Sequence, residues 1–284
     1  MPSATENLAI PLGSLVLVTG ANGFIASHVI DQLLQANFRV RGTVRKLTKG
    51  LWLNDFFCSK YGPGKFDLVE VPDMAVPHAY DEAVKGASGL VHVATPVLVT
   101  YDPNEGIPMV TNGTVSILES ARKEPLLKRV VLTSSSTAAA SPQPNVEFTM
   151  DAGTWNEDIV RAAWAPPPYE GWQRRHNVYA ASKTEGEKIA WKWVRDNQPD
   201  FVLNTVLPNA NFGKMLSSQH QGFRSTAGWG ESCLGGYYVN VRDNALVHVA
   251  ALIYEDVRAE RLFAFAQPYN WNDILAAMRK LYPG

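Results

Sequence analysis

The strongest constraint on the fold is a glycine turn that joins an apolar run to a helical pattern. The run SLVLVT at 14–19 leads into TGANGFIASH, which has Gly20, Gly23 and a third small residue, Ala26. Gly20 permits a tight turn, Gly23 lets the backbone approach a pyrophosphate, and Ala26 lets the helix pack closely on the strand. Because the turn stands between a strand and a helix, it predicts a dinucleotide site. An ordinary glycine turn without a ligand is the alternative.

The start of the helix expected over 23–37 supplies the phosphate site. Backbone amides at a helix N-terminus point outward, and the helix dipole favours an anion there. Contacts to the dinucleotide are expected from the turn residues Thr19, Gly20, Asn22, Gly23, Phe24 and Ile25.

Strand and helix patterns alternate along the rest of the chain. Doubly buried strands separated by helices are typical of a parallel sheet with helices on both faces. The fold class is therefore α/β, with a Rossmann-type doubly wound parallel sheet. Further strands are expected at 38–44, 66–71, 90–95, 128–135 and 201–208, and further helices at 80–86, 104–123 and 178–197.

Two irregular stretches, 141–177 and 209–236, each follow an expected strand. Ligands of open α/β sheets bind beyond the carboxyl ends of the strands, so these stretches are expected to cover a substrate. We expect a dinucleotide-binding core over 11–207, to which 237–267 returns. A small substrate-binding region would then be built from the insertion at 208–236 and the C-terminal end at 268–284.

Composition narrows the possible partners and compartment. The chain of 284 residues has a net charge of -1, which gives no electrostatic case for nucleic acid or an anionic membrane. No apolar run approaches a membrane span, and the N-terminus lacks the features of a secretory signal. The two cysteines, Cys58 and Cys233, show neither metal-ligand spacing nor a disulfide framework. We therefore expect a cytoplasmic protein without a metal site.

The end of the second strand indicates which cofactor the site takes. An acidic residue there would bind the ribose 2′-hydroxyl of NAD, whereas a cation would pair with the 2′-phosphate of NADP. The segment RVRGTVRK has Arg45 and Lys46 at this end and no acid. These residues predict NADP, and solubilising charges at a sheet edge are the alternative.

Tyrosine and lysine stand four residues apart twice, as Tyr61 with Lys65 and as Tyr179 with Lys183. The Gly-Pro-Gly between the first two rules out a helix, so they have no fixed relation. The second pair opens the helix expected over 178–197, where this spacing places both on one face. A fixed ammonium there would lower the pKa of the phenol, and Tyr179 would then protonate a carbonyl oxygen. A surface tyrosine is the alternative.

Three serines, Ser134, Ser135 and Ser136, lie at the end of the strand expected over 128–135. One of their hydroxyls would hydrogen-bond the same carbonyl oxygen while a nicotinamide delivers hydride. A polar strand exit is the alternative. The glycine turn, the basic strand end, the serines and the Tyr-Lys helix follow one another in an order that favours carbonyl chemistry.

With these motifs the chain resembles the extended short-chain dehydrogenase/reductases, and within them the dihydroflavonol reductase branch. That branch includes fungal aldehyde and ketone reductases and yeast methylglyoxal reductase. The resemblance covers nearly the whole chain, through LVLVTGANGFIASH, VRGTVRK, HVATPV, NGT, VVLTSSS, YAASKTEGE and VLPN. It implies NADPH-dependent reduction of a small-molecule aldehyde or ketone to an alcohol by hydride transfer, in a monomer or homodimer.

The resemblance also implies roles for individual residues. Ser135, the second serine of the TSS stretch, would be catalytic together with Tyr179 and Lys183, and Lys183 would also hold the nicotinamide ribose. Arg45 would meet the 2′-phosphate. Further cofactor contacts are expected at Lys46, Asp73, Met74, Ala94, Thr95, Pro96, Thr133, Ser134, Tyr179, Lys183 and Pro208. Substrate contacts are expected at Val97, Ser136, Asn209 and Trp229, with a core tryptophan as the alternative for Trp229.

Two departures from the family pattern concern the substrate side. Relatives usually continue past RKLYPG, and LPNANFG replaces the usual ending after the sixth strand. Two other functions stay open. An epimerase or dehydratase acting on a nucleotide sugar would need a diphosphate clamp, for which Arg224 and Arg242 are scattered candidates. A non-catalytic NADPH-binding regulator would usually lack the Tyr-Lys pair.

Overall fold

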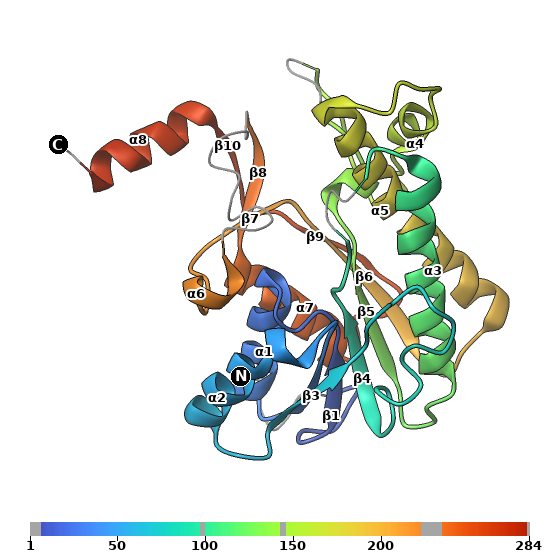
Figure 1. Ribbon diagram of the computed structural model, residues 1–284, viewed down its shortest axis with the longest axis vertical. Coiled ribbons are helices and arrows are strands. Elements are labelled where there is room, and N and C mark those ends of the chain that lie inside the picture. Colours follow the sequence, from blue (N-terminus) through green and yellow to red (C-terminus); the bar gives the residue numbers. More distant parts are fainter. Residues whose placement is uncertain (1–6, 97–99, 143–145, 223–234, 283–284) are drawn as a thin grey trace.

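The computed structural model describes residues 7–96, 100–142, 146–222 and 235–282. Its main element is a seven-stranded sheet in the order β3-β2-β1-β4-β5-β6-β9, and each neighbouring pair is parallel (Figure 1). This confirms the α/β class and the Rossmann-type doubly wound sheet. The strands are β1 (Leu15–Val18), β2 (Arg39–Val44), β3 (Phe66–Glu70), β4 (Ala87–His92), β5 (Arg129–Thr133), β6 (Val202–Pro208) and β9 (Arg261–Ala264).

Helices cover both faces of this sheet (Figure 1). Successive side chains of a strand point to opposite faces, so Val16 and Val18 belong to one core cluster and Leu17 to the other. Both faces of β1 are therefore apolar and buried. The first face is covered by α1 (Phe24–Gln35), α2 (Leu51–Tyr61) and α7 (Val241–Ile253), and the second by α3 (Pro103–Arg122) and α5 (Gly171–Asn197).

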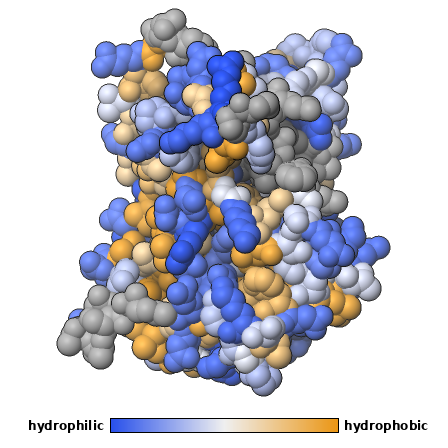
Figure 2. Space-filling view, turned by 90° about the vertical axis from the view of Figure 1, so that its left-hand side faces the viewer, coloured by the Kyte–Doolittle hydropathy of each residue, from blue (hydrophilic) through white to orange (hydrophobic). Residues whose placement is uncertain are grey.

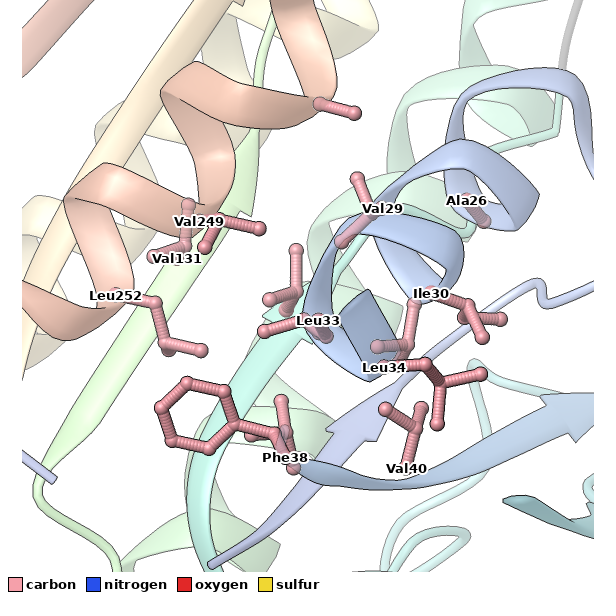
Figure 3. Close-up of a cluster of buried hydrophobic side chains, with 14 of the residues drawn as sticks. Ala26, Val29, Ile30, Leu33, Leu34, Phe38, Val40, Val131, Val249 and Leu252 are labelled. Carbon is pink, nitrogen blue, oxygen red and sulfur yellow. The ribbon is translucent and has the colours of Figure 1, made fainter. Parts of the chain in front are cut away.

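Helices α1 and α7 pack side by side on the first face. Leu33 of α1 and Leu252 of α7 are fully buried in one cluster, together with Val131 of β5 (Figure 3). Full burial of such a side chain contributes about 1.5–3 kcal/mol. This packing fixes the C-terminal half of α1, and Ala26 and Val29 of the same cluster fix its first turns, which follow the glycine turn.

A second sheet of three strands has the order β10-β8-β7. Its strands are β7 (Ala210–Phe212), β8 (Gly235–Asn240) and β10 (Gln267–Asn270), with β8 antiparallel to β10 and parallel to β7. Helix α8 (Trp271–Leu281) follows β10 and projects from the body of the molecule (Figure 1), and within this fully described helix no residue is buried. The remaining short elements are the 3₁₀ turns η1 (Leu47–Lys49) and η2 (Ser136–Ala138) and the helices α4 (Glu157–Ala163) and α6 (Ser218–Gln221).

Two expectations about local structure before α3 are wrong. Residues 80–86 form turns instead of a helix, because Gly86 has a φ of +75° and Arg41 takes the carbonyls of the segment. Strand β4 spans Ala87–His92 instead of 90–95. It ends early because the next two amides donate to the Thr19 hydroxyl and not to a neighbouring strand.

Helix α5 begins at Gly171 and not at 178. The prolines at 166–168 stop a helix from starting sooner, and nothing after them interrupts it. Arg174 joins this early part to the end of α4, since its guanidinium donates to the carbonyls of Ala162 and Ala165 at 3.3 and 2.6 Å. Tyr179 therefore lies well inside the helix, and the expectation that it opens the helix is wrong.

Over the described ranges, no helix has both the length and the apolar character needed to cross a membrane. On the face seen in Figure 2, hydrophobic and hydrophilic side chains are mixed. The same ranges contain no group of three or more His, Cys, Asp or Glu side chains that could hold a metal ion.

Gly42 of β2 allows a test of this packing. A Cβ there would lie 2.6 Å from the Cβ of Ala21 and 3.1 Å from the Phe66 ring. Overpacking a core costs ~1–3 kcal/mol, so Gly42→Ala should lower the free energy of unfolding in urea by about that amount. Gly153→Ala is the matched control, because the atom nearest to its Cβ would be 3.4 Å away. Equal effects of the two substitutions would refute this account.

Candidate active site

The glycine turn is pressed against the segment that follows β4. Gly20 has a φ of +69°, and a Cβ there would lie only 3.2 Å from the Cα of Ala94. Thr19 Oγ1 accepts hydrogen bonds from the amides of Val93 and Ala94, both at 3.0 Å. Two segments that the sequence assigns to the cofactor, the turn and the stretch after β4, thus lie side by side.

The start of α1 fits an anionic ligand. Gly23 is its N-cap, and in this described helix no side chain caps the first turn and no acidic residue lies in it. Outward-facing amides and the helix dipole favour a phosphate at such a terminus. Asn22, Phe24 and Ile25 lie around these amides in the sequence. The residues present therefore fit the pyrophosphate of a dinucleotide.

The ends of β2 and β3 converge near Tyr80. Arg45 and Lys46 follow β2 and are exposed. Burial raises the pKa of the Tyr80 phenol, while Arg45 lowers this pKa and Asp73 raises it, so both charges lie close to the ring. Met74, next to Asp73, is buried in the core cluster on the second face of the sheet. These expected adenosine-side residues therefore gather at one end of the sheet.

One acidic residue at this end was missed by sequence reasoning. Glu70 of β3 accepts a hydrogen bond from the Leu47 amide at 2.7 Å, directly after the basic segment. Glu70 lies opposite Val44 in the parallel register of β2 and β3. The second-strand motif could not predict this acid, because Glu70 belongs to the neighbouring strand β3. The other arginines of β2 are engaged elsewhere, Arg39 with the Gly13 carbonyl and Arg41 with Asp67.

Ser135 and Tyr179 meet between the end of β5 and α5. The Ser135 Oγ accepts hydrogen bonds from the amide and the hydroxyl of Thr137 at 3.3 and 3.0 Å. Its own proton is thereby left for another acceptor, and the Tyr179 phenol lies nearby, since the Ser135 hydroxyl lowers the pKa of Tyr179. Of the three serines, Ser135 is therefore the one that the structure joins to the tyrosine.

Lys183 is buried between α5, β5 and the segment after β4. Its Nζ donates to the carbonyl of Thr133 at 2.7 Å and to the hydroxyl of Thr95 at 3.1 Å. Burial lowers the pKa of Lys183 to about 8, and the nearby carboxylate of Glu187 raises it. The lysine is thus mostly an ammonium at neutral pH.

The expected effect of Lys183 on the phenol is not found. The pKa of Tyr179 is raised above its ordinary value because burial penalises the phenolate, and the hydrogen bond from Ser135 lowers it in part. The Lys183 ammonium is directed to Thr133 and Thr95 instead. The expectation that a lysine four residues away lowers the phenol pKa is therefore wrong, and Tyr179 holds its proton at neutral pH.

A narrow cleft opens beside Tyr179. Of the expected substrate residues, Ser136 begins η2 and is half-buried, and Asn209 follows β6 with its Oδ1 accepting from the Ala210 amide at 2.8 Å. Val97 and Trp229 lie outside the described residues. The cleft is lined by the segment after β4, α3 and α5, through Pro96, Thr100, Gly106, Met109, Val178, Tyr179 and Ser182.

Two residues expected to contact the cofactor form their side-chain hydrogen bonds with buried protein groups instead. The Thr133 hydroxyl pairs with His248 Nε2 at 2.8 Å, so that only its carbonyl meets Lys183. The Ser134 hydroxyl donates to Glu187 at 2.7 Å. Pro208 ends β6 beside Ala264 of β9.

Sequence reasoning also missed two buried histidines. His92 of β4 pairs with the Thr19 hydroxyl at 3.0 Å, and His248 of α7 pairs with Thr133. Burial, together with a smaller effect of the Lys183 charge, lowers the pKa of His92 to about 3 and that of His248 to about 4. Both imidazoles are neutral at pH 7. A single histidine within an apolar segment gives no sign that it supports a site.

The chain matches the NAD dependent epimerase/dehydratase family over residues 16–225. It is 41% identical to aldehyde reductase 2 of Sporidiobolus salmonicolor, covering 98% of this chain and 84% of that protein. It is also 41% identical to the ketoreductase adrE of Penicillium rubens, covering 98% and 83%. Among solved structures, yeast methylglyoxal/isovaleraldehyde reductase Gre2 in complex with NADPH is similar, with a TM-score of 0.81, 28% identity and coverage of 95% and 83%.

The buried histidines generate a prediction about stability and pH. The unfolded His248 binds a proton below pH 6.5, whereas in the folded protein its pKa is about 4. The unfolded state therefore gains protons first, and the free energy of unfolding falls as the pH drops from 6.5. His248→Gln should reduce this fall by up to ~1.4 kcal/mol per pH unit.

The measurement is urea unfolding between about pH 6.5 and 5, where few carboxyl groups titrate. His220→Gln is the control, because His220 is exposed. A His248→Gln variant with the same pH slope as the unsubstituted protein would contradict the burial argument.

Proposed function

Since the chain belongs to the NAD dependent epimerase/dehydratase family, we propose that it is an NADPH-dependent oxidoreductase that reduces an aldehyde or a ketone to an alcohol. The observation that carries this proposal is the arrangement of Ser135 at the end of β5 and Tyr179 beside the cleft, with Lys183 one turn further along α5. The relatives named aldehyde reductase and ketoreductase support the same reaction.

We assign the proton transfer to Tyr179. Its raised pKa keeps the phenol protonated at neutral pH, as a proton donor requires. Ser135 donates a hydrogen bond to the same carbonyl oxygen and stabilises the negative charge that develops there. When bound, NADPH supplies the hydride to the carbonyl carbon. The oxygen then takes the Tyr179 proton, and the phenolate regains one from solvent.

We assign Lys183 to the electrostatics and the geometry of this step. Its ammonium, fixed by Thr133 and Thr95 one helical turn from the phenol, would hold the nicotinamide ribose and so place the cofactor beside Tyr179. Thr95 follows β4 next to Ala94, which packs on the glycine turn. The lysine therefore links the proton donor to the segment that we assign to the cofactor.

We assign the 2′-phosphate to Arg45 and Lys46. Both are exposed at the end of β2, and neither forms an ion pair with a described residue. Glu70 holds the Leu47 amide, so its carboxylate anchors the turn that carries the two cations. The complex of Gre2 with NADPH supports this choice of cofactor.

We further propose the division into a core over 11–207 with 237–267 and a substrate region from 208–236 and 268–284. Strand β9 and helix α7, within 237–267, belong to the main sheet and its cover, whereas β7 and most of β10 lie in the substrate region. Strand β8 of the small sheet crosses the proposed boundary at residue 237. The cytoplasm is the proposed compartment, on the ground that the two cysteines lack a disulfide framework.

The direct test follows NADPH oxidation by absorbance with a panel of small aldehydes and β-keto esters. Carbonyl-dependent oxidation is expected. NADPH binding without turnover of any member of the panel would favour a regulator instead. A nucleotide-sugar enzyme receives no support from Arg242, whose charge lowers the pKa of His28 on α1 and of Tyr61 on α2, and Arg224 lies outside the described residues.

The two tyrosines that precede a lysine by four residues provide an internal control. Tyr179→Phe should lower turnover by roughly 10²–10⁴-fold, because it removes the proton donor. Tyr61 ends α2 and donates to Asp31, while Lys65 reaches Asn37. Tyr61→Phe should therefore keep its turnover and lose about 1 kcal/mol of stability. Steady-state kinetics and urea unfolding measure both effects, and similar losses of turnover would exclude the assignment.

Cofactor choice is tested at Arg45. Arg45→Ala should weaken NADPH binding by ~1.5–3 kcal/mol and leave NADH binding unchanged, because it removes one charge-assisted contact to the 2′-phosphate. Fluorescence titration gives the dissociation constants. Arg39→Ala is the matched control on the same strand, since Arg39 is bound to the Gly13 carbonyl. Equal affinity of the unsubstituted protein for NADPH and NADH would sink the prediction.

A further inference from the structure

Glu187 is a buried carboxylate directly behind the proposed catalytic residues. It lies one helical turn after Lys183 on α5, and its side chain is 0% exposed. It accepts hydrogen bonds from the hydroxyls of Ser134 and Thr205, both at 2.7 Å, and from Trp191 Nε1 at 3.3 Å. Three elements, β5, β6 and α5, are thus joined at one carboxylate.

Arg261 of β9 completes this arrangement. Its Nε and Nη2 donate to the two carboxylate oxygens of Glu187 at 2.8 and 3.3 Å, and its side chain is 6% exposed. Its Nη1 donates to the carbonyls of Ala152 and Thr154 at 2.7 and 2.8 Å, and its guanidinium lies 3.8 Å from the centre of the Trp155 ring. A buried ion pair with so many partners fixes its own geometry.

The arrangement reaches the catalytic side chains by two short routes. Ser134, which donates to Glu187, is the residue before Ser135, and its amide donates to the Val206 carbonyl at 2.7 Å. Glu187 and Lys183 also line one small pocket, together with Ser134. Glu187 therefore affects the position of Ser135 through the backbone and the charge of Lys183 through an electrostatic interaction.

The charged and titratable groups around Lys183 come from several elements. Tyr179 and Glu187 share α5 with it, His92 faces it from β4, and His248 faces it from α7. Burial keeps both imidazoles neutral at pH 7. Among the described residues, Glu187 is thus the negative charge that acts on Lys183.

We infer that Glu187 is a positioning residue of the active centre. Through Ser134 it fixes the end of β5 that presents Ser135, and it places a negative charge behind the Lys183 ammonium. The inference rests on the proposed reductase function, because it assigns Ser135 and Lys183 to the reaction. The partners of Glu187 lie far apart in the sequence: Ser134 follows β5, Thr205 lies on β6 and Arg261 lies on β9.

The charge effect has a definite sign. Glu187 raises the pKa of Lys183, which burial holds at about 8. Removing the carboxylate charge must therefore move the titration of Lys183 to lower pH. In the Glu187→Gln variant we expect a downward shift of roughly one pH unit, since an opposite charge within about 4–6 Å shifts a pKa by ~1–3 units.

The first experiment reads this titration in the ligand-free protein by ¹³C NMR of labelled lysine, with Lys183→Met identifying the resonance. Glu119→Gln is the matched control: Glu119 also accepts from an α5 tryptophan, Trp193, at 2.6 Å, but it lies on α3 away from Lys183. We expect the control to titrate as the unsubstituted protein does. An unshifted Lys183 in Glu187→Gln would overturn the charge effect.

Kinetics test the geometric effect. Glu187→Asp keeps the charge and shortens the reach, so the Lys183 titration should return while kcat at saturating NADPH stays roughly 10- to 100-fold low. Ser134→Ala should lower kcat and leave the titration in place. The inference fails if both variants keep the kcat of the unsubstituted protein.

Misfolding of a variant and failure of the proposed function can both be distinguished from failure of the inference. Glu187→Gln leaves Arg261 without a counter-charge, and if that variant does not fold, the combination of Glu187→Gln with Arg261→Met removes both charges and must show the same shift of Lys183. Absence of carbonyl-dependent NADPH oxidation in the unsubstituted protein would refute the proposed function. The NMR titration would still decide whether Glu187 controls the charge of Lys183.

Discussion

The parallel pairing of β1, β4 and β5 is the constraint on which the site depends. Parallel neighbours end at the same edge of a sheet, so the segments that follow them meet there. The glycine turn follows β1, Ala94 and Thr95 follow β4, and Ser135 follows β5. The sheet itself therefore brings these segments into contact, as in the hydrogen bond from the Ala94 amide to the Thr19 hydroxyl.

Patterns that are short in sequence were predictable. The glycine turn, the strand that precedes it and the helix that follows it are read from one stretch, and the structure has them as expected. The helix over 104–123 is also correct in spite of Pro108, because a helix with a buried apolar face tolerates one internal proline. The prediction that Tyr61 and Lys65 do not share a helix is also correct, since α2 ends at Tyr61 and Gly62 is its C-cap.

Local structure and side-chain contacts that depend on residues of distant strands were not predictable. Arg41 bonds the carbonyls at 83 and 85 and so converts an expected helix into turns. Glu187 stands in the motif YAASKTEGE, but its partners Thr205 and Arg261 lie on two later strands. Helices α2 and α7 were not expected either. Their role is seen only once α1 and the sheet are in place, because their apolar residues pack against those elements.

Behind the site, polar groups are paired across the middle of the sheet. His92 with Thr19 and His248 with Thr133 leave neither imidazole without a partner. Burying an unpaired polar group costs several kcal/mol, whereas paired groups hold a unique arrangement. The polar groups around Lys183 are therefore held in fixed pairs, and with both imidazoles neutral at pH 7 the lysine is the charged member of this group.

Helix α5 forms one continuous rod from Gly171 to Asn197. Its 27 residues span roughly 40 Å at 1.5 Å per residue. At its start Trp172 stacks on His176 with ring centres 5.1 Å apart, and Tyr179 follows within one turn. Further along, Glu187 clamps the rod to the sheet. Near its start the rod is held as well, because Arg174 donates to the carbonyls of Ala162 and Ala165. Tyr179 therefore lies between two anchors, and inserting or deleting one helical residue between Arg174 and Tyr179 would turn the phenol away from the cleft.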